Sequence, residues 1–170
     1  FLAFLDPRKP SAASAIRQLH EHGIEVKVLS GDNDAVVRTI ARQVGIDTRN
    51  ALTGPEFAVM SVEQQKKAVA VTTVFSKLTP LQKTQIITLL QEQDNTVGFL
   101  GDGINDAAAL RLSDIGISVD SAVDIAKESA DIILLEKDLM VLEDGVLEGR
   151  KTFGNIVKYV KMTASSNFGN

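Results

Sequence analysis

Short apolar runs alternate along most of the chain with longer segments of helical periodicity. The apolar runs are at most six residues long, and most of them end in turns that contain glycine, proline or aspartate. The longer segments carry apolar residues at the three- and four-residue spacing of an amphipathic helix. The runs predict strands at 1–5, 74–75, 96–100, 115–119 and 132–135, and the alternation of apolar and charged residues at 24–29 predicts another strand. The periodic segments predict helices at 11–22, 35–44, 62–71, 80–91, 107–110, 123–129 and 139–162.

Local signals support several of these boundaries. Ser61 with Gln64 and Thr79 with Gln82 match capping boxes at the starts of two helices. Residues 52–55 contain glycine followed by proline and are interpreted as a turn. Strands and helices that alternate with short connections predict an α/β fold, a doubly wound, mostly parallel sheet with helices on both faces.

Composition narrows the classes of protein that this chain can represent. At 170 residues it is long enough for one well-buried domain. Eighteen basic and 22 acidic residues leave a net charge of −4, so nucleic acid is not expected as a partner. The absence of cysteine excludes a disulfide framework and a thiolate metal site. No signal peptide is recognised, and no uncharged run approaches the roughly 20 residues that span a bilayer, so the chain is expected to be soluble.

Three polar loops follow predicted strands, at 30–33, 77–83 and 101–106. Because the carboxyl ends of parallel strands lie at one edge of a sheet, we expect these loops to meet. The first loop, Ser-Gly-Asp-Asn, precedes a helix whose backbone N–H groups would point at an anion. In the second, Lys83 places a cation on the first turn of a helix, where a bound anion would stabilise it.

The third loop, Gly-Asp-Gly-Ile-Asn-Asp, gathers Asp102, Asn105 and Asp106 within five residues. Carboxylates this close repel unless a cation lies between them, and Mg²⁺ prefers such oxygen ligands. A phosphate with Mg²⁺ fits the combined loops, whereas an acidic turn without a ligand is the alternative. Asp6 is the remaining carboxylate at a strand end, but Pro7 beside it has no side-chain oxygen, which disfavours Asp6 as a nucleophile.

These motifs resemble, in order and spacing, those of the phosphorylation domain of P-type cation-transporting ATPases, a member of the haloacid dehalogenase-like superfamily. The similarity covers essentially the whole chain, and its later segments are most similar to the bacterial magnesium-transporting subgroup. It implies a Rossmann-like sheet that ends in a long stalk-like helix, with 1–145 as the C-terminal portion of the domain and 146–170 as the stalk. The motifs that carry the resemblance lie at 6–8, 29–33, 79–83 and 101–106.

The resemblance also implies roles for individual residues. Asp102 would coordinate Mg²⁺ with support from Asp106, and both would act in catalysis with Lys83. Asp6 would be a hinge residue near the nucleotide. The residues implied to bind phosphate or nucleotide are Ser30, Gly31, Asp32, Lys77, Lys83 and Asn105.

Two departures from the family pattern stand out. The aspartate-lysine-threonine segment, whose aspartate accepts phosphate in the family, does not occur in this chain, and Ala108 stands where the family usually has proline. The chain is therefore interpreted as the second half of a phosphorylation domain, inactive alone and prone to associate through open sheet edges.

The resemblance implies that the chain is one part of a larger parent protein. That parent would use ATP and Mg²⁺, transport a cation (magnesium by resemblance alone), contain further domains and lie in the plasma membrane, with this segment on the cytoplasmic side. Two alternatives stay open. The chain could be a stand-alone phosphatase of the same superfamily that uses Asp6, or a non-catalytic module that binds cation or phosphate.

Overall fold

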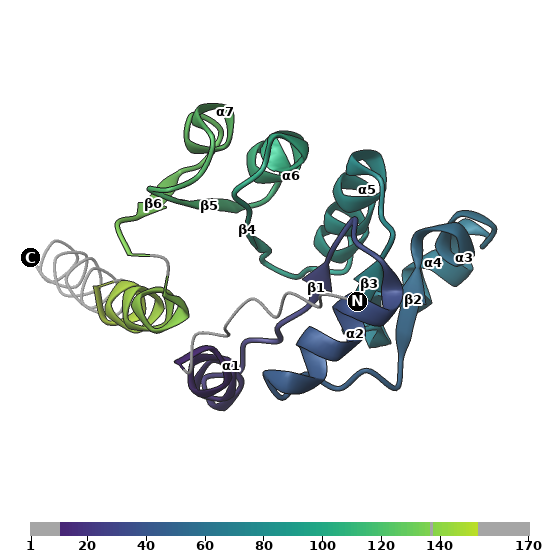
Figure 1. The fold of residues 1–170 in the computed structure, drawn as a ribbon, viewed down its shortest axis with the longest axis horizontal. Coiled ribbons are helices and arrows are strands. Elements are labelled where there is room, and N and C mark those ends of the chain that lie inside the picture. The colour runs from purple at the N-terminus through teal and green to yellow at the C-terminus, as the bar shows by residue number, and fades with distance from the viewer. Residues whose placement is uncertain (1–10, 137, 153–170) are drawn as a thin grey trace, which may run out of the picture.

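A computed structural model of the chain describes residues 11–136 and 138–152 (Figure 1). Within these residues a further helix covers 139–152, beyond those named next. The helices are α1 (Ser11–Glu21), α2 (Asp34–Gln43), α3 (Gly54–Ala58), α4 (Val62–Val71), α5 (Pro80–Gln91), α6 (Ala107–Leu112) and α7 (Asp124–Lys127), with a 3-10 turn at Ile104–Asp106. The strands are β1 (Val28–Leu29), β2 (Ala51–Thr53), β3 (Val74–Ser76), β4 (Gly98–Leu100), β5 (Ile115–Val119) and β6 (Ile132–Leu134).

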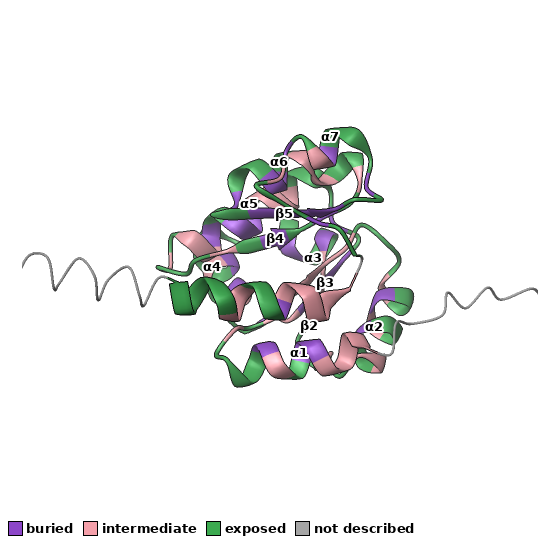
Figure 2. Ribbon diagram, turned by 90° about the vertical axis from the view of Figure 1, so that its left-hand side faces the viewer, coloured by how far each residue is buried: buried purple, intermediate pink, exposed green. Residues whose placement is uncertain are grey.

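The predicted α/β class is confirmed, since every strand pairing among the described residues is parallel. Helices cover both faces: α5, α6 and α7 lie on one side of the strands, and α1, α2 and helix 139–152 lie on the other (Figures 1 and 2). The strands form two three-stranded sheets, ordered β1-β3-β2 and β4-β5-β6. The described part of the fold is thus doubly wound but interrupted in the middle of its sheet.

Helices hold the two sheets together. On one face, Ile87 of α5 packs in the core of the β4-β5-β6 half, while Ile86 of the same helix packs around Phe75 of β3. On the other face, Leu139 packs against the core beneath β1 and β3, and Val141 packs against the core of the other half. Apolar burial therefore joins the two halves where strand pairing does not.

The inner edges of the two sheets are β1 and β4. The backbone N–H of Val28 donates to the residue before β3, and that of Ser30 donates to β3 itself. Because N–H directions alternate along a strand, the N–H of Leu29 points away from β3. Gly101 donates to β5, so the N–H of Leu100 points away from β5. No pairing joins β1 to β4 in the described ranges, which agrees with the predicted open edges.

Both predicted capping boxes are present. Ser61 Oγ accepts from the backbone N–H of Gln64, whose side chain accepts from the N–H of Ser61, and Thr79 and Gln82 repeat the arrangement. The helix predicted at 80–91 has these same limits in the structure. Local hydrogen bonding was sufficient to place these helix starts because both partners lie within three residues.

The turn predicted at 52–55 is wrong. The chain continues there as β2 and passes directly into α3, which Thr53 caps by accepting from the N–H of Glu56 at 3.4 Å while Glu56 accepts from the N–H and hydroxyl of Thr53. Pro55 is accommodated because the first helical turn needs no donor at that position. Gly54 is required by a close approach, since a Cβ would collide with the backbone carbonyl of Lys77.

Two predicted strands also need correction. The strand predicted at 24–29 is paired only at its last two residues, as β1. The run at 96–100 is predicted as a buried strand, but only Phe99 of β4 is buried, whereas Gly98 and Leu100, which point to the other face of the strand, are exposed. The strand predicted at 1–5 and the part of the last helix beyond 152 lie outside the described residues.

Gly116 is needed where β5 packs against α6. A Cβ at this position would lie 2.5 Å from the backbone oxygen of Leu110, so the strand and the helix would have to separate. We expect Gly116→Ala to lower the free energy of unfolding by about 1–3 kcal/mol, as overpacking usually does. Gly145→Ala, in the open middle of helix 139–152, should raise it by about 0.5–1 kcal/mol. Denaturant unfolding of both variants tests this contrast, and equal effects would contradict it.

Candidate phosphate and metal site

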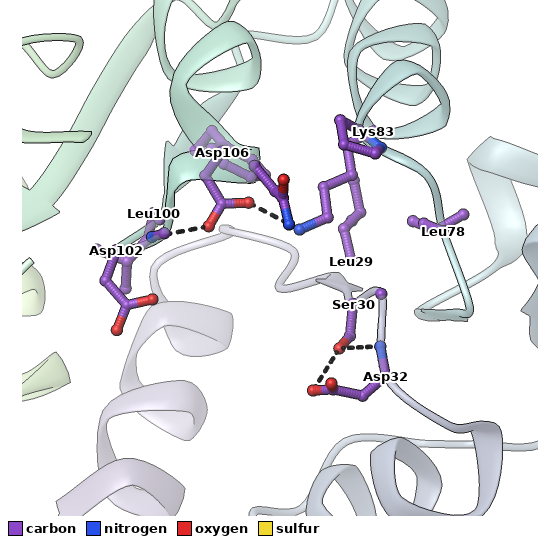
Figure 3. A pocket seen from close by; sticks show the side chains of 14 residues that line it. Leu29, Ser30, Asp32, Leu78, Lys83, Leu100, Asp102 and Asp106 are labelled. Atoms are coloured by element: carbon purple, nitrogen blue, oxygen red, sulfur yellow. Dashed lines mark hydrogen bonds and ion pairs between the residues drawn. The ribbon is translucent and has the colours of Figure 1, made fainter. Parts of the chain in front are cut away.

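A cavity of about 400 Å³ opens between the carboxyl ends of β1 and β4 (Figure 3). The loop after β1, the start of α5 and the loop after β4 all contribute to its lining. The three loops therefore meet at one edge of the sheet, as predicted. The lining residues are Leu29, Ser30, Gly31, Asp32, Leu78, Pro80, Lys83, Phe99, Leu100, Gly101, Asp102, Gly103, Asn105 and Asp106.

The loop after β1 is folded on itself and tied to its neighbour. Ser30 Oγ donates to Asp32 Oδ2 at 3.1 Å and accepts from the Asp32 N–H at 3.1 Å. The N–H of Leu78 donates to the Ser30 carbonyl, and that of Lys77 donates to the Asp32 carbonyl, both at 3.0 Å. These bonds fix the hydroxyl and the backbone of the loop at one wall of the cavity.

Asp34 anchors the same loop to β3, a role that the sequence analysis missed. Its carboxylate accepts from Ser76 Oγ at 2.6 Å and from Arg38 Nε at 2.7 Å. The hydrogen bond from Ser76 and then that from Arg38 hold the pKa of the Asp34 carboxyl below its ordinary value. The spacing of Asp34 and Arg38, four residues apart on a helix, was a visible signal. The contact with Ser76 joins residues 42 positions apart and gave no such signal.

The lowered pKa of Asp34 makes its contribution to stability pH-dependent. A carboxyl with a lower pKa in the folded state stabilises fully above the unfolded pKa and loses this effect as pH falls through the folded pKa. We expect Asp34→Asn to cost about 1–2 kcal/mol at pH 7 and progressively less below about pH 4. Denaturant unfolding between pH 7 and pH 2.5 measures this difference. Ser76→Ala should make the difference less dependent on pH, and a constant cost at every pH would contradict the assignment.

The opposite wall is built on an ion pair. Lys83 Nζ on the first turn of α5 lies 2.7 Å from Asp106 Oδ1, and the two side chains are only 11% and 14% exposed. Asp106 Oδ2 accepts from the Gly103 N–H at 3.2 Å, which closes the turn of the loop after β4. The Asp106 carboxylate is therefore paired with the ammonium group of Lys83, and this ion pair holds the lysine side chain at the cavity.

Asp102 lies on the far side of Asp106 from Lys83 (Figure 3). Asp102 and Asn105 are both exposed and line the cavity. Mg²⁺ in proteins commonly uses one or two carboxylates and takes its other oxygens from water and substrate phosphate. The carboxylate of Asp102 and the amide of Asn105, which both line the cavity, fit that habit. When bound, Mg²⁺ would supply positive charge to a phosphate oxygen.

One predicted site residue is not brought to the cavity. Lys77 is not among the lining residues; its backbone is left-handed, with φ 51°, and its N–H is taken by Asp32. Asp6 lies outside the described residues. Ala108 lies in the first turn of α6, which forms with alanine where the family usually has proline.

Comparison with known proteins decides the family. The family described as haloacid dehalogenase-like hydrolase matches residues 1–114, about two thirds of the chain. The chain belongs to the haloacid dehalogenase-like hydrolases. Parallel strands whose carboxyl ends lie around one cavity with a lysine of α5 and the carboxylates of the loop after β4 are consistent with this membership.

Proteins named as magnesium-transporting ATPases are similar to this chain along essentially its whole length. It is 63% identical to "Magnesium-transporting ATPase, P-type 1" of Salmonella typhimurium strain LT2 over 169 residues, 99% of this chain and 19% of the relative. The protein of the same name from Escherichia coli strain K12 is 54% identical over 170 residues, 100% of this chain and again 19% of the relative. The chain therefore spans about a fifth of the length of these relatives, and the predicted resemblance is confirmed.

A solved structure supports the same assignment. The catalytic domain of the CPx-ATPase CopB-B, from a study of its conformational changes upon nucleotide binding, superposes with a TM-score of 0.62 at 30% identity. The match covers 81% of this chain and 44% of that chain. The haloacid dehalogenase-like α/β fold predicted from the sequence is thus confirmed.

Proposed function

We propose that this chain supplies the phosphate- and Mg²⁺-binding walls of the aspartyl-phosphate site in an ATP-driven cation pump. The observation that carries this proposal is the cavity, because it joins a nearly buried lysine, an exposed carboxylate and a hydrogen-bonded hydroxyl loop at the carboxyl ends of parallel strands. These are the groups that phosphoryl transfer requires, since its catalysis rests on positioning and on neutralising charge.

Each wall has a task in this proposal. Lys83 binds a phosphate oxygen through a charge-assisted hydrogen bond and is kept in place by Asp106. The loop that contains Ser30 and Asp32 lines the cavity beside the same phosphate, and its hydroxyl would exchange the hydrogen bond that it donates to Asp32 for one to a phosphate oxygen. Asp102 and Asn105 line the cavity, and the Asp102 carboxylate is the proposed ligand of Mg²⁺.

The phosphate acceptor comes from elsewhere in the protein. Among the described residues, no carboxylate lines the cavity besides Asp32, Asp102 and Asp106, and these belong to the proposed walls. The cavity lies where β1 and β4 end without pairing, so an additional strand inserted between them would carry its own carboxyl end to the centre of the site. We assign the aspartate-lysine-threonine segment of the family to this position, which makes the chain inactive by itself.

The wider setting of the site is part of the same proposal. The relatives are named as magnesium-transporting ATPases, which favours magnesium as the transported ion and ATP as the substrate of the whole protein. Within the described residues no helix has the length and apolar character to cross a membrane. We propose that residues 146–170, which begin within helix 139–152, serve as a stalk toward a membrane span elsewhere in the protein. We also propose that this chain lies on the cytoplasmic side of the membrane.

Binding of inorganic phosphate in the presence of Mg²⁺ tests the proposed walls. We expect calorimetry to show phosphate affinity that falls about tenfold or more in Lys83→Met, since a charge-assisted hydrogen bond is lost. Because that change leaves Asp106 without its lysine, the double variant Lys83→Met, Asp106→Asn separates phosphate binding from stability, and it should bind as poorly. Lys66→Met, which breaks the surface pair with Glu92, is the matched control.

The outcomes distinguish the open alternatives. Phosphate binding that is equal in Lys83→Met and Lys66→Met would overturn the proposed site. Hydrolysis of a generic phosphomonoester by the chain alone, lost in Asp6→Asn, would favour the stand-alone phosphatase instead. Binding of phosphate and Mg²⁺ by the chain, with no phosphorylation of the full-length protein, would favour the non-catalytic module.

A further inference from the structure

The backbone that carries Asp102 is held from the neighbouring strand and from the loop that follows it. Ser118 Oγ, on β5, donates to the carbonyl of Gly101 at 2.9 Å. The N–H of Val123, just before α7, donates to the carbonyl of Asp102 at 3.2 Å. Two successive carbonyl groups of the loop therefore accept hydrogen bonds from residues outside it.

The hydroxyl of Ser118 lies in an unusual place for a polar group. Ser118 is 0% exposed, and its neighbours Ile117 and Val119 both belong to the apolar core of this half of the sheet. A buried hydroxyl costs free energy unless it forms a hydrogen bond, and the bond that it forms here ends on the residue directly before Asp102.

The loop has little freedom to adjust if that bond is removed. A Cβ on Gly101 would lie 2.6 Å from the Cβ of Asp106, so the two ends of the loop are in close contact. Gly101 is itself buried, and without Ser118 Oγ its carbonyl would lose a donor in a place that water does not readily reach. Any shift that recovers a hydrogen bond there must move the adjacent Asp102.

We propose that Ser118 is a positioning residue for Asp102, and that it acts with the Val123 N–H to aim the Asp102 carboxylate at Mg²⁺. This inference rests on the proposed function, because it assumes that Asp102 is the Mg²⁺ ligand. Ser118 touches neither metal nor phosphate in this arrangement. Its effect passes through the peptide group between Gly101 and Asp102.

The chain contains a close control for this inference. Ser113 is 9% exposed, and its Oγ donates to the Leu110 carbonyl at 2.9 Å, at the end of α6. Ser113→Ala and Ser118→Ala thus remove the same kind of buried hydroxyl from a backbone carbonyl. Only Ser118 is bonded to the loop that carries Asp102.

Mg²⁺ titration of the full chain by calorimetry, with inorganic phosphate present, tests the inference. We expect Ser118→Ala to raise the Kd for Mg²⁺ at least fivefold and Ser113→Ala to change it less than twofold, while thermal unfolding shows comparable losses of stability. Val123→Pro removes only the second donor, at a residue whose φ of −65° proline can adopt, and should also weaken Mg²⁺ binding. If Ser118→Ala does not fold, Val123→Pro carries the test.

The possible results separate this inference from the function on which it rests. Equal Kd values in Ser118→Ala, Ser113→Ala and the unmodified chain, with a large loss in Asp102→Asn, would overturn the role of Ser118 and leave the proposed function intact. Absence of Mg²⁺ binding to the unmodified chain, or binding that Asp102→Asn leaves unchanged, would overturn the metal assignment and this inference together.

Discussion

Asp102→Asn is expected to reduce phosphoenzyme formation in the full-length protein by about a hundredfold or more. Asparagine keeps an oxygen atom at this position but removes the negative charge, and a metal that polarises a phosphate is worth several kcal/mol to the transition state. Each 1.36 kcal/mol corresponds to a factor of ten in rate. Transfer of labelled phosphate from ATP to the protein, followed on a denaturing gel, measures the effect.

Asp94→Asn is the matched control for this prediction. Asp94 is exposed and has a left-handed backbone, with φ 60°, a conformation that asparagine adopts more readily than most residues. The substitution therefore makes the same chemical change outside the residues that line the cavity, and phosphoenzyme levels should stay normal. Normal levels in Asp102→Asn as well would show that Asp102 is not the metal ligand.

A peptide that carries the family's aspartate-lysine-threonine strand is expected to insert between β1 and β4. The N–H groups of Leu29 and Leu100 point away from the strands with which β1 and β4 are paired, so an inserted strand gives them new acceptors. Amide exchange at these two residues should slow by about tenfold or more, as protection by a strand requires. Isotope-edited NMR resolves both amides.

Two controls make this second prediction specific. Val28 and Ser30 already donate to the β3 side, so their exchange should change much less than that of Leu29. A scrambled peptide of the same composition should protect neither inner edge. Protection of the outer strands β2 and β6 in place of β1 and β4 would contradict the proposed position of the missing strand. The predicted self-association of the chain should decrease in light scattering when the correct peptide is bound.

The chemistry of the site was visible in the sequence because each of its loops is short and local. The Gly-Asp-Gly-Ile-Asn-Asp loop places two carboxylates and an amide within five residues, and the lysine of the second loop follows a capping box that fixes the start of α5. The parallel α/β class then required these loops to share one edge. Periodicity, caps and strand-end position all depend on residues that are near neighbours in the chain.

The contacts that hold those loops could not be predicted in the same way. Asp34 pairs with Ser76, and Ser118 reaches Gly101, across 42 and 17 positions. Gly54 looked like part of a turn, but it is required because α3 approaches Lys77 in the folded chain. The structural roles of such residues can be assigned only when their partners in the folded chain are known.

By itself, the sequence determined the alternation of helices and strands outside β2 and α3, the family resemblance and the residues that carry charge to the site. Only the tertiary structure decided that the sheet is interrupted between β1 and β4, that Asp106 pairs with Lys83, and that Asp102 stands apart from that pair at the cavity. The physical reason is that strand pairing and ion pairing depend on distance in space. A linear pattern of apolar and polar residues records that distance only between near neighbours.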